Sequence, residues 1–223
     1  MMPCRLARRV AAWALVLLIV GLAATPAVAR SYPPILGAKA GLTSTNLNPP
    51  ARVPSVPLWG AMLGRWRAGM ACGPVKMPGA PCTTAGWKEA LEQGRGKQGY
   101  ALLKAVNDAF NDARYPYVAD AQDYWETPYQ FLEKSGDCED YAIAKYMALQ
   151  QLGVHDDDMM IIVVSAKNMG GIGHAILIVF LGDDGYVLDI LNRTVMKQEL
   201  AAPFYEPLIG VNTKFWMYLH HVT

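Results

Sequence analysis

The sequence predicts an α+β fold in which helices come first and an antiparallel sheet follows. Between residues 58 and 152, apolar side chains recur at helical spacing, whereas after Gly153 they form short β-branched runs bounded by turn residues. Helices and strands that occur in separate runs are typical of α+β proteins. With 223 residues, of which 52% are hydrophobic, the chain is long enough to bury a full core.

Residues 1–29 are predicted to be a signal peptide. A basic segment with three arginines precedes an apolar run over residues 11–24, and Ala27-Val28-Ala29 has the form of a small-residue cleavage site. The apolar run is about 14 residues long, short of the roughly 20 that cross a bilayer. We therefore expect an exported chain with no stable transmembrane segment after cleavage. A retained N-terminal anchor is the alternative.

The charge of the mature chain argues against a nucleic-acid partner. Without the three leader arginines, the 20 basic residues fall to 17 against 19 acidic residues, a formal charge of −2. A nucleic-acid-binding domain normally carries a basic patch, so we expect none of this class.

Two regions are predicted after the leader. Residues 30–57 contain six prolines among Ser, Thr and Asn, and are expected to form an extended arm. Residues 58–223 are expected to form one domain. Its helices are predicted at 58–70, 87–93, 99–113, from the cap Thr127 and Pro128 onward, and from Cys138 to Leu152; its strands are predicted at 159–165, 175–181, 186–189 and 214–219.

A cysteine opens the last of these helices. Asp137 has the chemistry of an N-cap, and Asp140, three residues on, can complete a capping box. Cys138 is then the first helical residue, where the positive end of the helix dipole favours the thiolate. This position predicts a nucleophile. A buried, inert cysteine is the alternative.

The other cysteines have structural explanations. Cys4 leaves with the leader, and Cys72 and Cys82 lie ten residues apart in a loop rich in Gly and Pro. In an exported protein these two are predicted to form a disulfide, which would stabilise the fold by roughly 3 kcal/mol. Cys138 is then expected to be the unpaired thiol.

A nucleophilic cysteine needs a base, and His174 is the best placed of the four histidines. It follows a glycine-rich loop and opens an apolar strand, whereas Asp189 ends the next strand. A turn near residue 184 brings both to the same end of the two strands. Each residue alone could be structural, but together Cys138, His174 and Asp189 predict a nucleophile, a base and a carboxylate that orients the base.

These residues resemble a known family. Gly136-Asp137-Cys138-Glu139-Asp140-Tyr141-Ala142, Gly173-His174-Ala175 and Val187-Leu188-Asp189 are similar to motifs of the bacterial transglutaminase-like cysteine proteinases, and within them of the LapG-type periplasmic proteases. The resemblance covers about residues 66–219 and includes Trp125-Glu126-Thr127-Pro128. It implies a transglutaminase-like or papain-like cysteine protease core with the three residues above as its triad.

The resemblance implies a substrate, a regulator and a compartment. The substrate is a large repeat-containing surface adhesin that is cut near its N-terminus at a site with two alanines, which releases it and promotes biofilm dispersal. The regulator is an inner-membrane receptor that senses cyclic di-GMP and sequesters the protease. Both place the protein in the periplasm.

Calcium dependence is also implied. Asp137, Glu139 and Asp140 put three negative charges beside the thiol, which opposes thiolate formation, and a bound divalent cation would reverse that field. The resemblance makes these three acids the expected Ca²⁺ ligands, with oxygen donors that suit calcium. Three carboxylates rarely complete a calcium shell, so Asp156, Asp157 and Asp158 are considered as further donors. From composition alone, the acids could be ordinary partners of the helix dipole.

The expected reaction is hydrolysis of a peptide bond through an acyl-enzyme. The backbone N–H of Cys138 is predicted to bind the oxyanion, with the Trp125 indole considered as a second donor. A narrow cleft shaped by Tyr124, Trp125 and the Gly170-Gly171 loop would select small side chains. Two alternatives remain open at this point: a transglutaminase or other amide acyl-transferase that uses the same triad, and a non-catalytic calcium-binding module.

Overall fold

The computed structural model describes residues 34–44, 55–68 and 85–220. The predicted signal peptide at 1–29 and the loop that contains Cys72 and Cys82 lie outside these residues. Among the described helices, none has both the length and the apolar character needed to cross a membrane.

The described elements follow the expected order of helices and then strands. They are β1 (Lys39–Ser44), α1 (Ser55–Arg67), α2 (Ala85–Gly94), α3 (Gly99–Phe110), α4 (Pro128–Lys134), α5 (Cys138–Gln151), β2 (Met159–Ala166), β3 (Ile172–Leu181), β4 (Asp184–Leu188), β5 (Met196–Lys197), α6 (Gln198–Ala201), β6 (Tyr205–Val211) and β7 (Trp216–His220), with short 3-10 turns at 156–158, 167–169 and 202–204.

All strand pairs in the sheet are antiparallel, and the strand order is β1-β7-β6-β2-β3-β4-β5. The long hairpin of β2 and β3 forms its centre. Because helices and an antiparallel sheet occupy separate parts of the chain, the predicted α+β class is confirmed.

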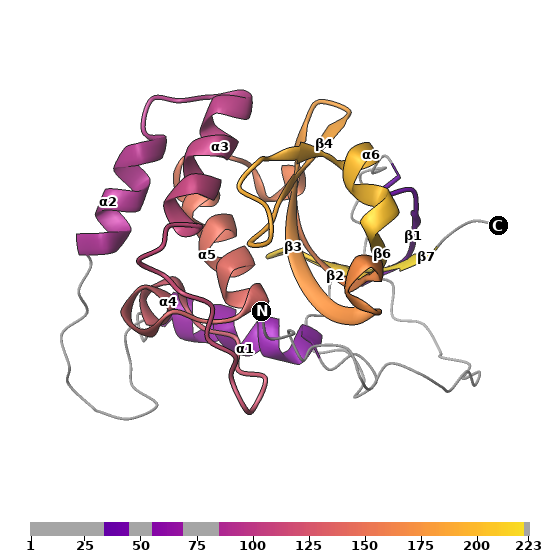
Figure 1. The fold of residues 1–223 in the computed structure, drawn as a ribbon, viewed down its shortest axis with the longest axis horizontal. Helices are drawn as coiled ribbons and strands as arrows, with labels where there is room; N and C mark the ends of the chain where they lie inside the picture. The colour runs from indigo at the N-terminus through magenta and orange to yellow at the C-terminus, as the bar shows by residue number, and fades with distance from the viewer. Residues whose placement is uncertain (1–33, 45–54, 69–84, 221–223) are drawn as a thin grey trace, which may run out of the picture.

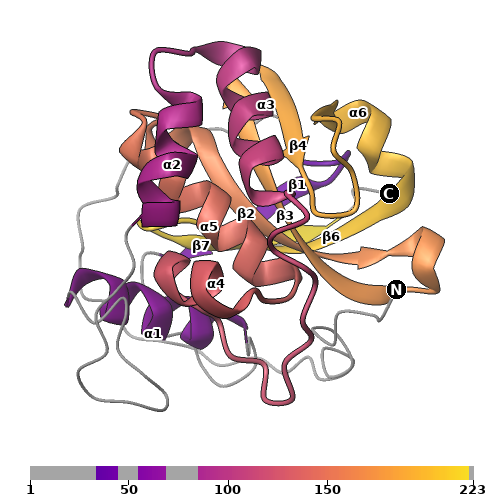
Figure 2. The ribbon, with the colours of Figure 1, turned by 60° about the vertical axis from the view of Figure 1, so that its left-hand side comes forward.

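The sheet is covered on both faces. Helices α1 to α5 gather on one side of it, and α6 lies on the other side beside β4 (Figures 1 and 2). On the helix face, Ile161 and Leu177 join one hydrophobic cluster, whereas their neighbours Ile162 and Ile178 point into a second cluster on the opposite face. Burial on both faces explains why the predicted strands are continuous apolar runs without alternation.

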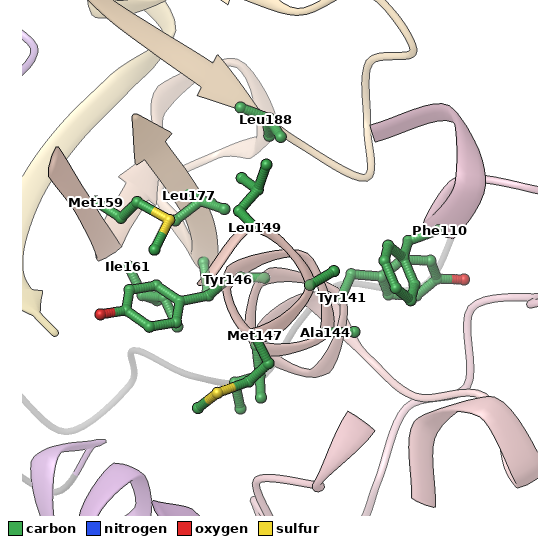
Figure 3. Packing of buried hydrophobic residues seen from close by; sticks show 14 of the residues in the cluster. Phe110, Tyr141, Ala144, Tyr146, Met147, Leu149, Met159, Ile161, Leu177 and Leu188 are labelled. Carbon is green, nitrogen blue, oxygen red and sulfur yellow. The ribbon is translucent and has the colours of Figure 1, made fainter. Parts of the chain in front are cut away.

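Helix α5 is buried on nearly all its sides. Figure 3, which looks along the helix, shows Leu149 pointing toward Leu188 of β4 and Tyr146 pointing toward Ile161 of β2. Phe110 of α3 lies beside the helix on the side of Tyr141. A helix that packs in every direction has little freedom to shift. The core therefore fixes the position of Cys138 at its N-terminus.

The structure adds elements that the sequence did not predict. Residues 39–44 of the proline-rich segment form an edge strand, and Ile35, Leu36 and Ala38 are buried against the second cluster. Strand β6 was also missed, because Glu206, Pro207 and Gly210 interrupt its apolar pattern. Strand β3 begins at Ile172, so His174 lies inside the strand rather than before it.

Candidate active site

One cavity of about 410 Å³ contains both the predicted nucleophile and the predicted base in its lining. Cys138 reaches it from the start of α5, and His174 reaches it from β3. The remaining wall is largely apolar and includes Tyr115, Tyr141 and Leu191. A mostly apolar site strengthens electrostatic interactions between catalytic groups.

The local structure around Cys138 is the one expected from its sequence. Asp137 caps α5, and the side chain of Asp140 accepts a hydrogen bond from the backbone N–H of Asp137 at 3.1 Å. Cys138 is the first helical residue and is only 1% exposed. The dipole argument for a nucleophile at this position therefore applies to the folded protein.

The redox state of Cys138 differs from the expectation. Its sulfur is disulfide-bonded in this structure, so Cys138 is not the unpaired thiol in this state. The predicted Cys72–Cys82 bond lies outside the described residues and stays a prediction. A sulfur in a disulfide is not a nucleophile, so catalysis requires the reduced form.

His174 and Asp189 form the predicted pair. Nε2 of His174 lies 2.8 Å from Oδ1 of Asp189, and both side chains are buried. The pairing of Leu177 with Leu188, continued by one residue, sets Asp189 opposite Ile176. Because side chains alternate along a strand, Asp189 then shares a face with His174 and is its diagonal neighbour. The hydrogen bond occupies Nε2 and leaves Nδ1 for the cysteine.

Asp189 is held by several donors. Its Oδ1 also accepts a hydrogen bond from the backbone N–H of Leu191 at 3.0 Å, and its Oδ2 accepts one from the hydroxyl of Tyr205. Burial alone would raise the pKa of Asp189, but the charge of His174 and these hydrogen bonds outweigh it and hold the pKa below its usual value. Asp189 is therefore ionised at neutral pH, as a residue that orients an imidazole must be.

An acidic cluster lies beside the nucleophile. Oε2 of Glu139 lies 3.1 Å from the sulfur of Cys138, and the carboxyl groups of Asp137 and Asp123 lie close enough to that of Glu139 to influence its protonation. Burial is the main cause that raises the pKa of Asp137 to about 6, and it raises the pKa of Glu139 well above its usual value. Without a cation these groups must share protons, because several buried negative charges cannot coexist at this distance.

The cluster contains oxygen donors of the kind that suit the calcium ion that the resemblance implies. Oδ1 of Asp123 and Oδ1 of Asp137 are buried and accept no hydrogen bond within the described residues. Such oxygens are expensive to bury, and a hard cation would satisfy them. Residues 34–44, 55–68 and 85–220 contain no group of three His, Cys, Asp or Glu side chains with the spacing of a metal site.

The three predicted calcium ligands do not all have the same surroundings. Asp137 and Glu139 lie in the cluster. The two carboxylate oxygens of Asp140 instead accept hydrogen bonds from the backbone N–H groups of Glu126 at 2.8 Å and of Asp137 at 3.1 Å. Asp140 thereby ties the preceding loop to α5, and its role as third ligand stays a prediction. Asp123 belongs to the cluster and was missed, because nothing in the sequence links it to residue 137.

Asp156, Asp157 and Asp158, considered above as further donors, lie too far from Asp137 to share an ion with it. They follow the C-terminus of the 14-residue helix α5, which is about 20 Å long at 1.5 Å per residue. Asp156 instead accepts hydrogen bonds from Tyr146 and Gln150, both at 2.8 Å.

The residues expected to shape the cleft lie elsewhere. Of the described residues, neither Tyr124, Trp125 nor the Gly170-Gly171 pair lines the cavity. The Trp125 ring packs edge-on against Trp59 with 6.3 Å between centroids, as a core residue does. Its indole Nε1 is buried and makes no hydrogen bond within the described residues, so its role as a second oxyanion donor stays a prediction. Met169 and Gly173, on either side of the glycine pair, do line the cavity.

Two residues near the site, one partly and one fully buried, had no sequence signal. Asn111, at the end of α3, donates a hydrogen bond to the backbone oxygen of Asp189 at 2.7 Å and lines the cavity. Lys145 is 0% exposed, and its Nζ makes no hydrogen bond within the described residues. Burial lowers the pKa of Lys145 to about 7, and Asp189 is the acid that opposes this shift. An amphipathic pattern places lysine on a surface, so only packing could show it inside.

Comparisons with known proteins agree with this geometry. The sequence profile of the family described as bacterial transglutaminase-like cysteine proteinase BTLCP matches residues 80–221. No curated protein sequence matches the chain. Solved structures of LapG from Legionella pneumophila are similar to it. One is 28% identical with a TM-score of 0.53 and covers 59% of this chain and 75% of that chain.

Two further LapG structures differ in their calcium content. A calcium-bound form is 25% identical with a TM-score of 0.54, covering 67% of this chain and 84% of that chain. An EGTA-treated form is 28% identical with a TM-score of 0.53, covering 59% of this chain and 73% of that chain. These proteins share their fold with the chain described above.

Proposed function

Since this chain belongs to the bacterial transglutaminase-like cysteine proteinases, we propose that it uses Cys138, His174 and Asp189 to cleave a large surface adhesin in the periplasm. The chain is a cysteine protease of the family that its motifs resemble. The observation that supports the triad is the single cavity shared by Cys138 and His174, with Asp189 bonded to the far nitrogen of the imidazole.

The reaction follows from this geometry. In the reduced enzyme, His174 takes the thiol proton through Nδ1, and the sulfur of Cys138 attacks the scissile carbonyl. Asp189 keeps the proton of Nε2 in place and stabilises the imidazolium that forms. His174 then gives its proton to the leaving amine, and water hydrolyses the acyl-enzyme. The backbone N–H of Cys138, at the start of α5, is our proposed oxyanion donor.

Calcium is our proposed cofactor, with Asp137 and Glu139 as ligands and Asp140 and Asp123 beside them. Bound there, it would supply positive charge that offsets the carboxylates next to the sulfur and so favours the thiolate. The LapG structures, solved with calcium and after EGTA treatment, support a link between this fold and calcium.

The finer proposal is that the protease cuts the N-terminal region of the adhesin at a di-alanine site and so promotes biofilm dispersal. A cyclic di-GMP receptor in the inner membrane would sequester it. The similarity to LapG supports this choice of substrate. The cavity offers small residues such as Ala113 and Ala119 in its wall, which suits a substrate with small side chains.

The test is cleavage of an adhesin N-terminal fragment from the same genome by the reduced, calcium-loaded protein. We expect one cut between or beside two alanines, lost in Cys138→Ala and after addition of EGTA. A di-alanine to di-leucine change in the fragment is the matched substrate control. Cleavage that persists in Cys138→Ala would contradict the triad.

The transferase alternative has its own readout. If a labelled amine is incorporated into a glutamine substrate and the fragment is not cleaved, the reaction is acyl transfer and not the proposed hydrolysis. The non-catalytic module would instead keep its calcium response and show neither reaction.

A further inference from the structure

Tyr205 contacts both members of the His174–Asp189 pair. It is the first residue of β6, where it pairs with Ala166 at the end of β2. Its hydroxyl donates a hydrogen bond to Oδ2 of Asp189, and its ring lies over the imidazole of His174, with centroids 5.9 Å apart and planes 31° apart. Tyr205 is itself 3% exposed, so these contacts are shielded from water.

The two oxygens of Asp189 have different donors. Oδ1 accepts from His174 and from the backbone N–H of Leu191, whereas among the described residues Tyr205 supplies the hydrogen bond to Oδ2. With donors on Oδ1 alone, the carboxylate could rotate about its bond to the chain. The hydroxyl on Oδ2 fixes that rotation, and the ring limits the tilt of the imidazole.

We propose that Tyr205 is a positioning residue of this protease, which acts through Asp189 and His174 and does not touch the substrate. The inference rests on the proposed triad and adds a fourth residue to it. Burial and the neighbouring Asp189 raise the pKa of Tyr205 above its usual value, so the phenol keeps its proton and remains a donor over the working pH range.

The physical effect has a defined sign. A hydrogen bond from Tyr205 draws negative charge away from Asp189. Without it, the carboxylate can turn and the pair is less well oriented, and orientation contributes to the chemical step rather than to substrate binding. A role in folding alone would change stability and leave kcat unchanged.

The chain offers a matched control in Tyr146. This tyrosine is also buried, and its hydroxyl also donates to a carboxylate, that of Asp156 at 2.8 Å, near the C-terminal end of α5. Tyr146→Phe therefore removes the same kind of hydrogen bond as Tyr205→Phe, away from the cavity. Both variants are expected to lose stability to urea, and Tyr146→Phe at least as much as Tyr205→Phe, because the Tyr146 hydroxyl also accepts a hydrogen bond from the backbone N–H of Thr213 at 3.2 Å.

The experiment compares the two variants as full-length, reduced and calcium-loaded proteins. We expect Tyr205→Phe to lower kcat on the adhesin fragment roughly tenfold with KM unchanged, the size expected for one lost charge-assisted hydrogen bond. We also expect Cys138 to react more slowly with iodoacetamide at a fixed pH, because a poorly oriented imidazole activates the thiol less. Tyr146→Phe should change neither. The proposal is overturned if both variants behave alike.

A double-mutant cycle gives a second test. If Tyr205 acts through Asp189, then Tyr205→Phe has no further effect on kcat in the Asp189→Asn background. Additive losses would overturn the proposal, as would a Tyr205→Phe protein that fails to fold while Tyr146→Phe folds. The reaction of Cys138 with iodoacetamide depends on the Cys138–His174 pair and needs no adhesin fragment. A wild type that is alkylated as expected but does not cut the fragment would therefore reject the proposed substrate and not the role of Tyr205.

Discussion

Nε2 of His174 and Oδ1 of Asp189 lie 2.8 Å apart inside the protein, across the hairpin of β3 and β4. The contact leaves Nδ1 as the ring nitrogen that can accept the proton of Cys138. Because Asp189 is buried and ionised, it fixes both the tautomer and the orientation of the ring. The predictions below test this arrangement and its surroundings.

Asp189→Asn should keep the fold and lose the orientation of the imidazole. An amide presents either an oxygen or an NH₂ group to Nε2 and no longer stabilises an imidazolium, so we expect kcat to fall roughly 10³-fold. Cleavage of the adhesin fragment measures this. The control is Asp184→Asn at the other end of β4, where the acid is exposed and paired with Lys197. Equal activity in both variants would contradict the assignment.

Reduction of the protein should switch activity on. The sulfur of Cys138 is disulfide-bonded in the structure, and only a thiolate attacks a carbonyl or reacts with iodoacetamide. Mass spectrometry should find Cys138 unlabelled by iodoacetamide without reductant and labelled after treatment with dithiothreitol. Cleavage activity should appear in parallel. Full labelling of the unreduced protein would contradict this prediction.

Calcium should stabilise the protein more at pH 7 than at pH 5. The folded pKa of Asp137, about 6, lies above its usual 3.8. The folded protein therefore binds this proton more tightly than the unfolded chain. For such a raised carboxyl, stability is lost as pH rises from about 4 through 6 in the absence of metal. A bound cation replaces the proton, and a calcium concentration of 100 times its Kd adds about 2.7 kcal/mol to the free energy of unfolding.

Thermal unfolding with calcium and with EGTA, at both pH values, measures this difference. Asp137→Asn should abolish most of the calcium response, whereas Asp158→Asn, beyond the far end of α5, should retain it. An equal rise in Tm at pH 5 and pH 7 would argue against carboxylate ligands at this site.

Lys145→Met should make the protein more stable at pH 6. Burial lowers the pKa of Lys145 from 10.5 to about 7 in the folded state. Between pH 7 and pH 10.5 the unfolded chain binds more protons than the folded protein, so stability rises with pH. The full cost of burying the charged lysine is present below pH 7. At about 1.4 kcal/mol per unit of pKa, methionine should add up to a few kcal/mol to the free energy of unfolding.

Urea unfolding at pH 6 and pH 9 checks the sign, because the gain should shrink at the higher pH. Lys104→Met is the control, since Lys104 is exposed on α3 and paired with Asp108. Its change should stay within about 0.5 kcal/mol. A loss of stability in Lys145→Met at pH 6 would contradict the prediction.

The sequence predicted the elements whose signals are local. The cap and capping box at Asp137 and Asp140 fixed the start of α5. The cap Thr127 followed by Pro128 fixed the start of α4. The turn at Asp183 to Gly185 set β3 against β4, and with it the distance between His174 and Asp189. These signals depend on residues close in the chain, which is why they could be read before any fold was known.

Other features depend on contacts between distant segments. Strand β6 and the edge strand β1 carry weak patterns, because pairing with neighbours rather than propensity holds them in the sheet. Tyr205 and Asn111 reach Asp189 only because β6 and α3 are packed beside it. Asp123 joins Asp137 and Glu139 through a loop whose path no periodicity describes.

By itself, the sequence predicted Cys138, His174 and Asp189 as one site, because helix caps, hairpin turns and strand alternation are local and place these three groups without knowledge of the rest. The tertiary structure decided which groups surround them. It buried Lys145, gathered the carboxyl groups of Asp123, Asp137 and Glu139, and set Tyr205 against Asp189. Burial and long-range packing shift proton affinities and orient side chains, and both arise only when the whole chain is folded.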